Sequence, residues 1–396
     1  MTTMAASEIQ SSIEKDLSDT PYACSNLTRL SGGTANFVYR GLLSKPLLDG
    51  TSTVIIKHAE EYLASDEGFR LTAERCLVEE SALRAMEGMH SVTTTHSPSS
   101  QTGEKGERYQ ITAKTPKIYH FNRSSHTQIM EDLPDSLDLK SFMLLRGVAE
   151  SISRDWASSL GETLGTWLKS FHIWINHPQQ GLIKGEFGES AFMRDLKFAV
   201  NYNGLLSKIE VFPEILERSR EIFQQVRDFA KSETEAEPDG LGIGAMHGDF
   251  WSGNVLLPKS SLSHPNPVTP LLITDWEMAQ VGPLALDLAQ MIAELYMLKL
   301  FKGIDAGVWL IHGFLKGYSE ASGSGNGDGI DEEMAFRILI HVGVHLVFWG
   351  STVPGWGDEE QVKGVVEVGR DMILCAWKRE RGVFEGDSVW GVLFGK

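Results

Sequence analysis

Three side chains with carboxylate or amide oxygens stand out by type and spacing: Asp249, Asn254 and Asp275. Four residues separate Asp249 from Asn254, and an apolar run precedes Asp275. Phosphoryl transfer to a hydroxyl needs one carboxylate that accepts the hydroxyl proton, and an amide oxygen and a second carboxylate that bind Mg²⁺ on the phosphates. Mg²⁺ prefers such hard oxygen ligands. We predict that Asp249 is catalytic and that Asn254 and Asp275 bind the metal.

Short apolar runs predict the strands that position these side chains. Residues 255–257 (VLL) follow Asn254, residues 271–273 (LLI) precede Asp275, and a Ser- and Pro-rich stretch separates the two runs. Apolar runs bounded by turn residues are typical of buried strands. We expect two catalytic strands joined by an inserted loop. The alternative is a polar turn between core strands that carries no chemistry.

A glycine-rich turn lies near the start of the chain. Strand-like residues 26–30 and 37–40 flank a turn that contains Gly32 and Gly33. Backbone amides of such a turn can bind phosphates, although an ordinary hairpin has the same pattern. Its position ahead of a lysine-bearing strand favours phosphate binding by Gly32 and Gly33.

A lysine and a glutamate are expected to form an ion pair near the phosphates. Residues 53–57 (TVIIK) predict a β-branched strand that ends at Lys57, and residues 71–86 have helical spacing. In phosphoryl transfer, a carboxylate from a helix can pair with such a lysine and hold it toward the phosphates. Glu79 is favoured as the partner, and the adjacent Glu80 stays open. The alternative for each of them is a solvated side chain.

Three segments carry a family resemblance: residues 247–254 (HGDFWSGN), 273–277 (ITDWE) and 287–289 (DLA). Together they resemble the superfamily of aminoglycoside phosphotransferases, choline kinases and methylthioribose kinases, whose fold is similar to that of protein kinases. The resemblance implies ATP and Mg²⁺ as cofactors and a small molecule as phosphate acceptor. It also implies that Asp287 braces the loop of residues 247–254, which we call the catalytic loop.

The resemblance implies an α+β, two-lobed protein-kinase-like fold. A small antiparallel-sheet lobe over residues 1–133 would bind ATP, and a larger, mainly helical lobe over 134–396 would carry catalysis and the acceptor site. The hinge would fall at Glu131–Leu133, whose backbone groups would recognise adenine. Polar residues 91–108 predict a disordered insertion in the small lobe.

The acceptor is harder to predict. Residues 31–40, 54–63 and 71–83 resemble methylthioribose kinases, whereas the DWE form of 275–277 is closer to choline kinases and aminoglycoside phosphotransferases. Asp287 follows Asp275 by twelve positions, which leaves no room for the activation segment of a protein kinase. We expect a small polyhydroxyl or amino-alcohol acceptor.

Two further features bear on this expectation. The acidic run at residues 358–360, close to Trp356, would suit a cationic acceptor, although such runs are usually solvated. His341 and His345 have the spacing of a metal pair but no Glu between them and no evident third ligand, so core histidines are expected instead. Trp251, inside the catalytic loop, could face the acceptor or pack in the core.

Composition excludes several classes of protein. The formal net charge of −17 disfavours nucleic acid and anionic membranes as partners. Three cysteines, far apart in the sequence, fit a reducing compartment. The N-terminal residues show no secretory signal, and the most apolar run, residues 338–349, is too short to span a bilayer. We expect a cytoplasmic protein; its oligomeric state is not indicated.

These patterns predict an ATP-dependent small-molecule kinase that transfers the γ-phosphate to a hydroxyl. An inactive nucleotide-binding pseudokinase or scaffold is the alternative, and the joint presence of Lys57, Asp249, Asn254 and Asp275 argues against it.

Overall fold

The computed structural model describes residues 2–30, 34–97, 108–181, 185, 191–235, 242–262, 268–321 and 329–395. The chain forms two compact units, which consist of Met1–Gly88 with Thr115–Pro134, and of Met89–Lys114 with Asp135–Lys396. Residues 89–114, which the sequence placed within the small lobe, therefore group with the second unit.

The first unit is built on a five-stranded sheet, which confirms the antiparallel arrangement that the family resemblance implied. Its strands, in spatial order, are β1 (Cys24–Arg29), β2 (Phe37–Leu43), β3 (Thr53–His58), β9 (Thr127–Glu131) and β8 (Ile118–Asn122). Alternate residues of β2 are buried, from Phe37 to Leu43, as expected of a strand with one face on the core.

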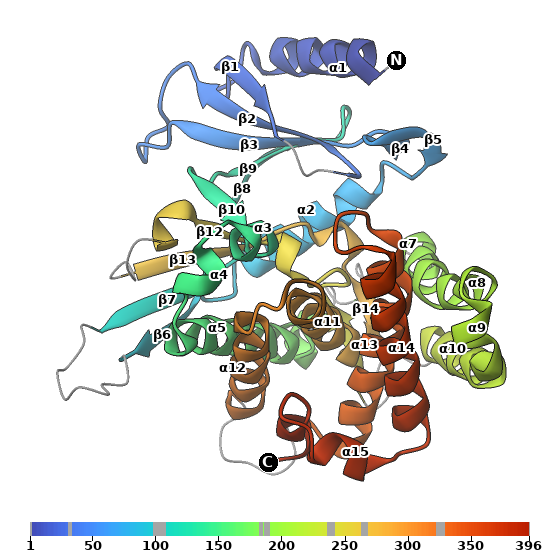
Figure 1. Cartoon of the computed structure of the whole chain (residues 1–396). Helices are drawn as coiled ribbons and strands as arrows, with labels where there is room; N and C mark the ends of the chain where they lie inside the picture. Colours follow the sequence, from blue (N-terminus) through green and yellow to red (C-terminus); the bar gives the residue numbers. More distant parts are fainter. Residues whose placement is uncertain are drawn as a thin grey trace. The chain divides into compact units, whose positions relative to one another are not determined.

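Helix α1 (Thr2–Leu17) covers part of this sheet (Figure 1). Ile9, Ile13 and Leu17, four residues apart, lie on one helical face and pack in a core cluster with Tyr39 and Val54. Removal of this apolar stripe from water fixes α1 on the sheet.

The remaining elements of the first unit are β4 (Tyr62–Leu63) and β5 (Asp66–Arg70), which form a hairpin, and helix α2 (Arg75–Met86). Helix α2 is tied to β9, because Gln128 Nε2 donates a hydrogen bond of 2.6 Å to the carbonyl of Cys76. This contact holds the helix that carries Glu79 beside the sheet that carries Lys57.

The second unit has its own five-stranded sheet. The spatial order is β10 (Ser136–Asp138), β12 (Val255–Pro258), β13 (Val268–Ile273), β7 (Tyr109–Lys114) and β6 (Val92–His96). β13 runs parallel to β7 and antiparallel to β12. A separate two-stranded ladder joins β11 (Ile243–Met246) to β14 (Gln280–Pro283). The strands predicted after Asn254 and before Asp275 are therefore present as β12 and β13.

The expected disorder across residues 91–108 is wrong for part of that segment. Residues Val92–His96 form β6, which pairs antiparallel with β7 and places Thr93 opposite Thr112. The β-branched run VTTTH suits an edge strand despite its low hydrophobicity. Residues 98–107 of the predicted insertion lie outside the described residues.

Two long helices of the second unit, α5 (Arg154–Ile175) and α12 (Ala306–Glu320), touch along their backbones. A Cβ on Gly161 or Gly165 would lie 2.2 or 2.0 Å from a carbonyl oxygen of α12. A Cβ on Gly313 or Gly317 would lie 2.0 or 2.1 Å from a carbonyl oxygen of α5. Only glycine permits so close an approach.

The predicted helical character of this unit is confirmed. Among the described residues, its other α-helices are α3 (Leu139–Leu144), α4 (Val148–Ser151), α7 (Ala191–Phe198), α8 (Gly204–Val211), α9 (Pro213–Leu216), α10 (Arg220–Thr234), α11 (Ala285–Lys302), α13 (Glu332–Thr352), α14 (Glu359–Trp377) and α15 (Arg381–Glu385). Among the described residues, α13 is long and apolar enough to cross a membrane, but 78% of its most apolar window is buried in the structure. That burial is the pattern of a core helix.

Candidate active site

The loop after β11 carries the first predicted catalytic residues and is held by Asp287 of α11. The backbone N–H of His247 donates to Asp287 Oδ2 at 2.8 Å, and that of Gly248 donates to Oδ1 at 3.0 Å. His172 of α5 donates from Nε2 to Oδ2 at 3.2 Å, and its Nδ1 lies 2.9 Å from the Tyr318 hydroxyl. Asp287, predicted to brace this loop, contacts it directly.

The charge state of this brace follows from its surroundings. Burial alone would raise the pKa of Asp287, but a hydrogen bond and the electrostatic effect of His172, with a hydrogen bond from the N–H of His247, outweigh it and lower that pKa. Burial lowers the pKa of His247. The Nδ1 of His247 accepts from the N–H of Asp249 at 3.2 Å, and its Nε2 donates to the Thr274 carbonyl at 3.1 Å, as a neutral ring can. The loop therefore rests on an ionised carboxylate and a neutral histidine.

Gly248 is required by the path of the loop. Its φ of 81° lies in the left-handed region. A Cβ at this position would lie 1.9 Å from the carbonyl oxygen of Met278. Both the dihedral angle and the available space favour glycine between His247 and Asp249.

The carboxylate of Asp249 is held on both oxygens by amide groups. Asn254 Nδ2 donates to Asp249 Oδ2 at 3.0 Å and to its backbone carbonyl at 2.9 Å. Gln290 Nε2 of α11 donates to Oδ1 at 2.6 Å. The structure thus brings the predicted pair Asp249 and Asn254 together and adds Gln290, which no local sequence pattern indicates.

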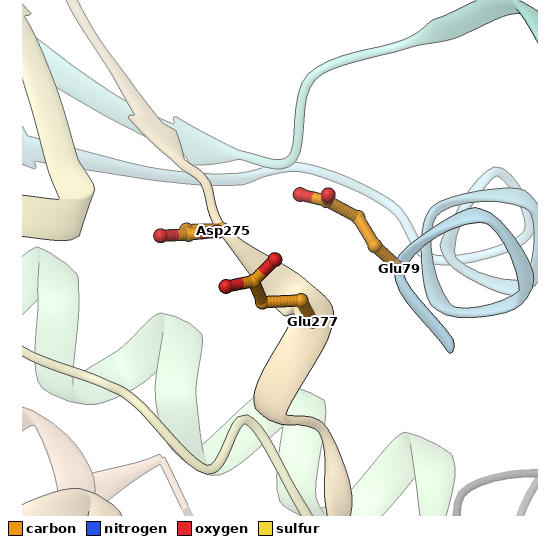
Figure 2. Close-up of side chains that lie close together, drawn as sticks. All are labelled: Glu79, Asp275 and Glu277. Atoms are coloured by element: carbon orange, nitrogen blue, oxygen red, sulfur yellow. The ribbon is translucent and has the colours of Figure 1, made fainter. Parts of the chain in front are cut away.

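Asp275 follows β13 and adopts a left-handed backbone conformation, with φ of 67°. Its neighbour Thr274 donates to the carbonyl of Asn254 from both its N–H, at 2.9 Å, and its hydroxyl, at 3.2 Å. The segments that carry Asn254 and Asp275 are therefore joined. Glu277 lies two residues further on, and its carboxylate approaches within 4.8 Å of that of Asp275 (Figure 2). The DWE motif could have indicated Glu277 as an additional ligand.

In the first unit, Lys57 of β3 and Glu79 of α2 form the expected ion pair. Their Nζ and Oε2 atoms lie 2.7 Å apart, and the two side chains are 10% and 2% exposed. Figure 2 shows Glu79 where it projects from α2. The neighbouring Glu80 pairs instead with Arg84 and, at 2.8 Å, with Arg123. The choice that the sequence left open is therefore resolved in favour of Glu79.

The predicted phosphate turn is described only at its far side, because Gly32 and Gly33 lie outside the described residues. The buried guanidinium of Arg75 donates to the carbonyl of Ala35 and to Asn36 Oδ1, both at 2.9 Å. Arg75 opens α2, so the end of the turn is attached to the helix that carries Glu79.

The predicted hinge follows β9. Glu131 pairs with Lys117 of the preceding segment, where its N–H donates to the Lys117 carbonyl at 2.8 Å. The next residue, Asp132, accepts two hydrogen bonds from Arg40 at 2.8 and 2.9 Å. This bidentate contact fixes the backbone between Glu131 and Leu133.

A cluster of two tryptophans and a glutamate surrounds Lys140 in the second unit. Lys140 Nζ lies 4.3 Å from the ring centroid of Trp356, 5.2 Å from that of Trp251, and 3.5 Å from Glu294 Oε2. Burial would raise the pKa of Glu294, but a hydrogen bond from His345 and the charges of His345 and Lys140 lower it. We call Lys140, Trp251, Trp356 and Glu294 the ammonium cluster.

The ammonium cluster lies close to the catalytic loop. Trp251 belongs to that loop, and Glu294 lies one helical turn after Gln290, which holds Asp249. His341 and His345, which have the spacing of a metal pair, are buried core histidines, as expected. His345 Nε2 bonds Glu294, and His341 Nδ1 accepts from the Tyr202 hydroxyl at 2.9 Å.

Comparison with known proteins agrees with this geometry. The sequence model of the phosphotransferase enzyme family matches residues 110–323. The chain is 32% identical to phosphotransferase FrzJ of Cladobotryum sp, over 96% of this chain and 94% of that protein. It is 24% identical to 4-hydroxytryptamine kinase of Psilocybe cyanescens, over 88% and 86% of the two chains. Amicoumacin kinase, solved with AMP-PNP, Ca²⁺ and Ami, has a similar fold: the TM-score is 0.50, the identity is 12%, and the match covers 95% of each chain.

Proposed function

Because this chain belongs to the phosphotransferase enzyme family and is a small-molecule kinase, we propose that Asp249 is its catalytic carboxylate and that it uses ATP with Mg²⁺. The observation that carries the proposal is the fixed orientation of the Asp249 carboxylate, because each of its two oxygens accepts a hydrogen bond from an amide. An inactive scaffold, the alternative raised by the sequence, is not favoured.

Asp249 would position the acceptor hydroxyl and accept its proton. With one lone pair of each oxygen engaged by an amide, the carboxylate keeps further lone pairs for that proton. As the acceptor oxygen bonds to the phosphorus, the bond from phosphorus to the leaving ADP oxygen breaks and the hydroxyl proton passes to Asp249. Most of the catalytic effect would come from this positioning.

The residues present fit a magnesium ion. Both hydrogens of the Asn254 amide point at Asp249, so Oδ1 is the atom of that group left to bind a cation. Asp275 adds a carboxylate, and Glu277 a second. These are hard oxygen donors of the kind that Mg²⁺ prefers. We propose Asn254 and Asp275 as ligands; when bound, the ion neutralises charge on the phosphates.

The first unit supplies groups suited to a nucleotide. Lys57, oriented by Glu79, would bind the phosphates, together with the turn at Gly32 and Gly33. The backbone groups of Glu131 and Leu133 would recognise the adenine edge. These roles correspond to the proposed lobes, residues 1–133 for ATP and 134–396 for catalysis and the acceptor.

The ammonium cluster favours an amino alcohol over a neutral polyol as acceptor. Two indole rings and an ionised glutamate bind ammonium groups by cation–π and charge attraction. In this structure the ammonium is that of Lys140, and an acceptor amine would have to take its place. The name of 4-hydroxytryptamine kinase likewise describes a hydroxylated amine as the acceptor of that relative.

The acidic run at residues 358–360 does not support an amine site. Asp358 caps α14 by accepting from the N–H of Gln361, and Glu359 pairs with Lys363 at 2.7 Å. These residues stabilise the start of a helix. The glutamate that suits an amine is Glu294.

The compartment and partners follow from weaker observations. Cys24, Cys76 and Cys375 are free thiols, which agrees with a cytoplasmic location. The net charge of −17 argues against nucleic acid and anionic membranes as partners.

The decisive experiment measures ADP release from ATP and Mg²⁺ with panels of hydroxylated amines, aminoglycosides and neutral sugars. Wild type should turn over at least one hydroxyl compound. Asp249→Asn should lower kcat by about 100- to 10,000-fold while nucleotide affinity stays within about twofold. Weak ATP binding by this variant would contradict the assignment of Asp249, and no turnover of any acceptor by wild type would contradict the proposed activity.

A further inference from the structure

A buried lysine close to the catalytic loop has no role in the mechanism above. Lys197 of α7 is 8% exposed, and its Nζ donates a hydrogen bond of 2.8 Å to Gln290 Oε1 of α11. The two residues are 93 positions apart in the chain. Burying an ammonium is costly unless a specific contact compensates, so its presence calls for an explanation.

Gln290 connects this lysine to Asp249. Its Nε2 lies 2.6 Å from Asp249 Oδ1, and its side chain is as buried as that of Lys197. The three residues form a continuous chain of hydrogen bonds, from the ammonium through the amide to the carboxylate. We call Lys197 and Gln290 the positioning relay.

The relay fixes the orientation of the amide. An ammonium can only donate hydrogen bonds, and an ionised carboxylate can only accept them. Gln290 therefore satisfies both neighbours in one orientation alone, with Oε1 toward Lys197 and Nε2 toward Asp249. The reversed amide would direct its oxygen at Asp249 Oδ1 and its NH₂ group at the ammonium of Lys197, so that neither contact would be a hydrogen bond.

We propose that Lys197 and Gln290 are positioning residues, which orient the carboxylate of Asp249 for the acceptor hydroxyl. Asn254 holds Oδ2 and the relay holds Oδ1, so the carboxylate cannot rotate about its χ2 bond without losing a contact. This inference rests on the proposed catalytic role of Asp249.

Burial and neighbouring charges have opposing effects on Lys197, and burial is the larger of the two, so the pKa of its ammonium is lowered. The charges of Asp249 and Asp287 act in the opposite direction to burial and favour the ammonium.

The test compares Lys197→Met, Gln290→Met and the double variant in the full-length protein. Each single variant should lower kcat about 10- to 100-fold, as loss of a supporting hydrogen bond often does, with nucleotide affinity and the acceptor KM changed less than twofold. Because the lysine acts only through Gln290, the double variant should be no slower than Gln290→Met. Losses that multiply in the double variant would overturn the relay.

Gln290→Glu separates orientation from packing. It keeps the volume and the contact with Lys197 but faces Asp249 with a second carboxylate, so kcat at pH 8 should fall further than in Gln290→Met. If Gln290→Glu matches wild type, the proposal is wrong. This variant also keeps the test available if Lys197→Met does not fold.

The matched control is Lys208→Met on α8, a half-buried lysine whose ammonium lies 5.4 Å from the ring centroid of Phe348. It removes a comparable side chain away from the catalytic loop and should leave kcat unchanged. Absence of wild-type turnover would refute the proposed activity, whereas wild-type turnover with an unaffected Lys197→Met variant would refute the relay alone.

Discussion

The catalytic loop of the second unit and the lysine strand of the first unit hold their polar groups in different ways. Asp249 is fixed by neutral amides and a braced backbone, whereas Lys57 and Glu79 form an ion pair between a strand and a helix. Loss of an amide donor alters geometry, but loss of one ion leaves its partner buried and charged. The two regions should therefore fail differently when they are mutated.

The largest effect on activity and stability is expected from a mutation of Gly248, where the backbone conformation and the surrounding space both require glycine. Gly248→Ala places a Cβ against the Met278 carbonyl and requires a left-handed alanine. It should lower kcat by about 100-fold through displacement of Asp249 and destabilise the fold by about 3 kcal/mol. Steady-state kinetics and thermal unfolding measure the two effects.

Gly355→Ala is the control for Gly248→Ala. Gly355 has a φ of 90° but nothing within 4 Å of its Cβ position. It should show only the dihedral cost, about 1 kcal/mol, with full activity. Equal effects at the two glycines would mean that space around the loop is not what restricts it.

Mutation of the Lys57–Glu79 ion pair should mainly lower the stability of the fold and kcat/KM for ATP. Glu79→Gln leaves Lys57 without its carboxylate, so we expect a loss of about 3 kcal/mol and a roughly tenfold fall in kcat/KM for ATP. Glu80→Gln, one residue away, removes only pairs with the exposed Arg84 and Arg123 and should cost at most about 1 kcal/mol. If Glu80→Gln impairs ATP use as strongly, the assignment of Glu79 fails.

The ammonium cluster allows a smaller, selective effect. Lys140→Met removes the internal competitor, so KM for amine acceptors should fall about fivefold, the equivalent of about 1 kcal/mol, with neutral acceptors unaffected. Glu294→Gln should raise KM for the same amines. A higher amine KM in Lys140→Met would show that Lys140 assists binding instead of competing with it.

The smallest effect concerns pH. Burial, with repulsion from Arg337 and Lys197, lowers the pKa of His341 well below its ordinary value. The unfolded chain therefore binds an additional proton as the pH falls below about 6.5, so stability is full above that pH and declines as the pH drops toward the folded-state pKa. His341→Gln should flatten the decline between pH 7.5 and 5.5 by about 1 kcal/mol. Parallel unfolding curves for the two proteins would contradict this expectation.

Residues that belong to a recognisable motif were the ones that sequence reasoning found. Asp249 and Asn254, five positions apart, were singled out by their types and spacing, and the structure brings the two side chains into contact. Gln290 and Lys197 were not found, because no local pattern connects them to the motif. Gln290 contacts Asp249 across 41 positions, and Lys197 contacts Gln290 across 93 positions. Adjacent Glu79 and Glu80 could not be ranked firmly, since only the packing of α2 decides which one faces Lys57.

The fold was predictable to a similar extent. Strand-like and β-branched residues indicated β2 and β3, and helical spacing indicated α2. The edge strand β6 was missed because its threonines resemble a solvated loop until a neighbouring strand is available for pairing.

The glycine contact between α5 and α12 has a consequence for directed evolution. Each of its glycines faces a main-chain carbonyl of the opposite helix, so no second-site change can restore the space that an added methyl group would take. α5 also carries His172 and α12 carries Tyr318, so a shifted helix would disturb the support of the catalytic loop from a distance. Libraries that aim at new acceptors should keep these four glycines fixed and vary the positions around Lys140.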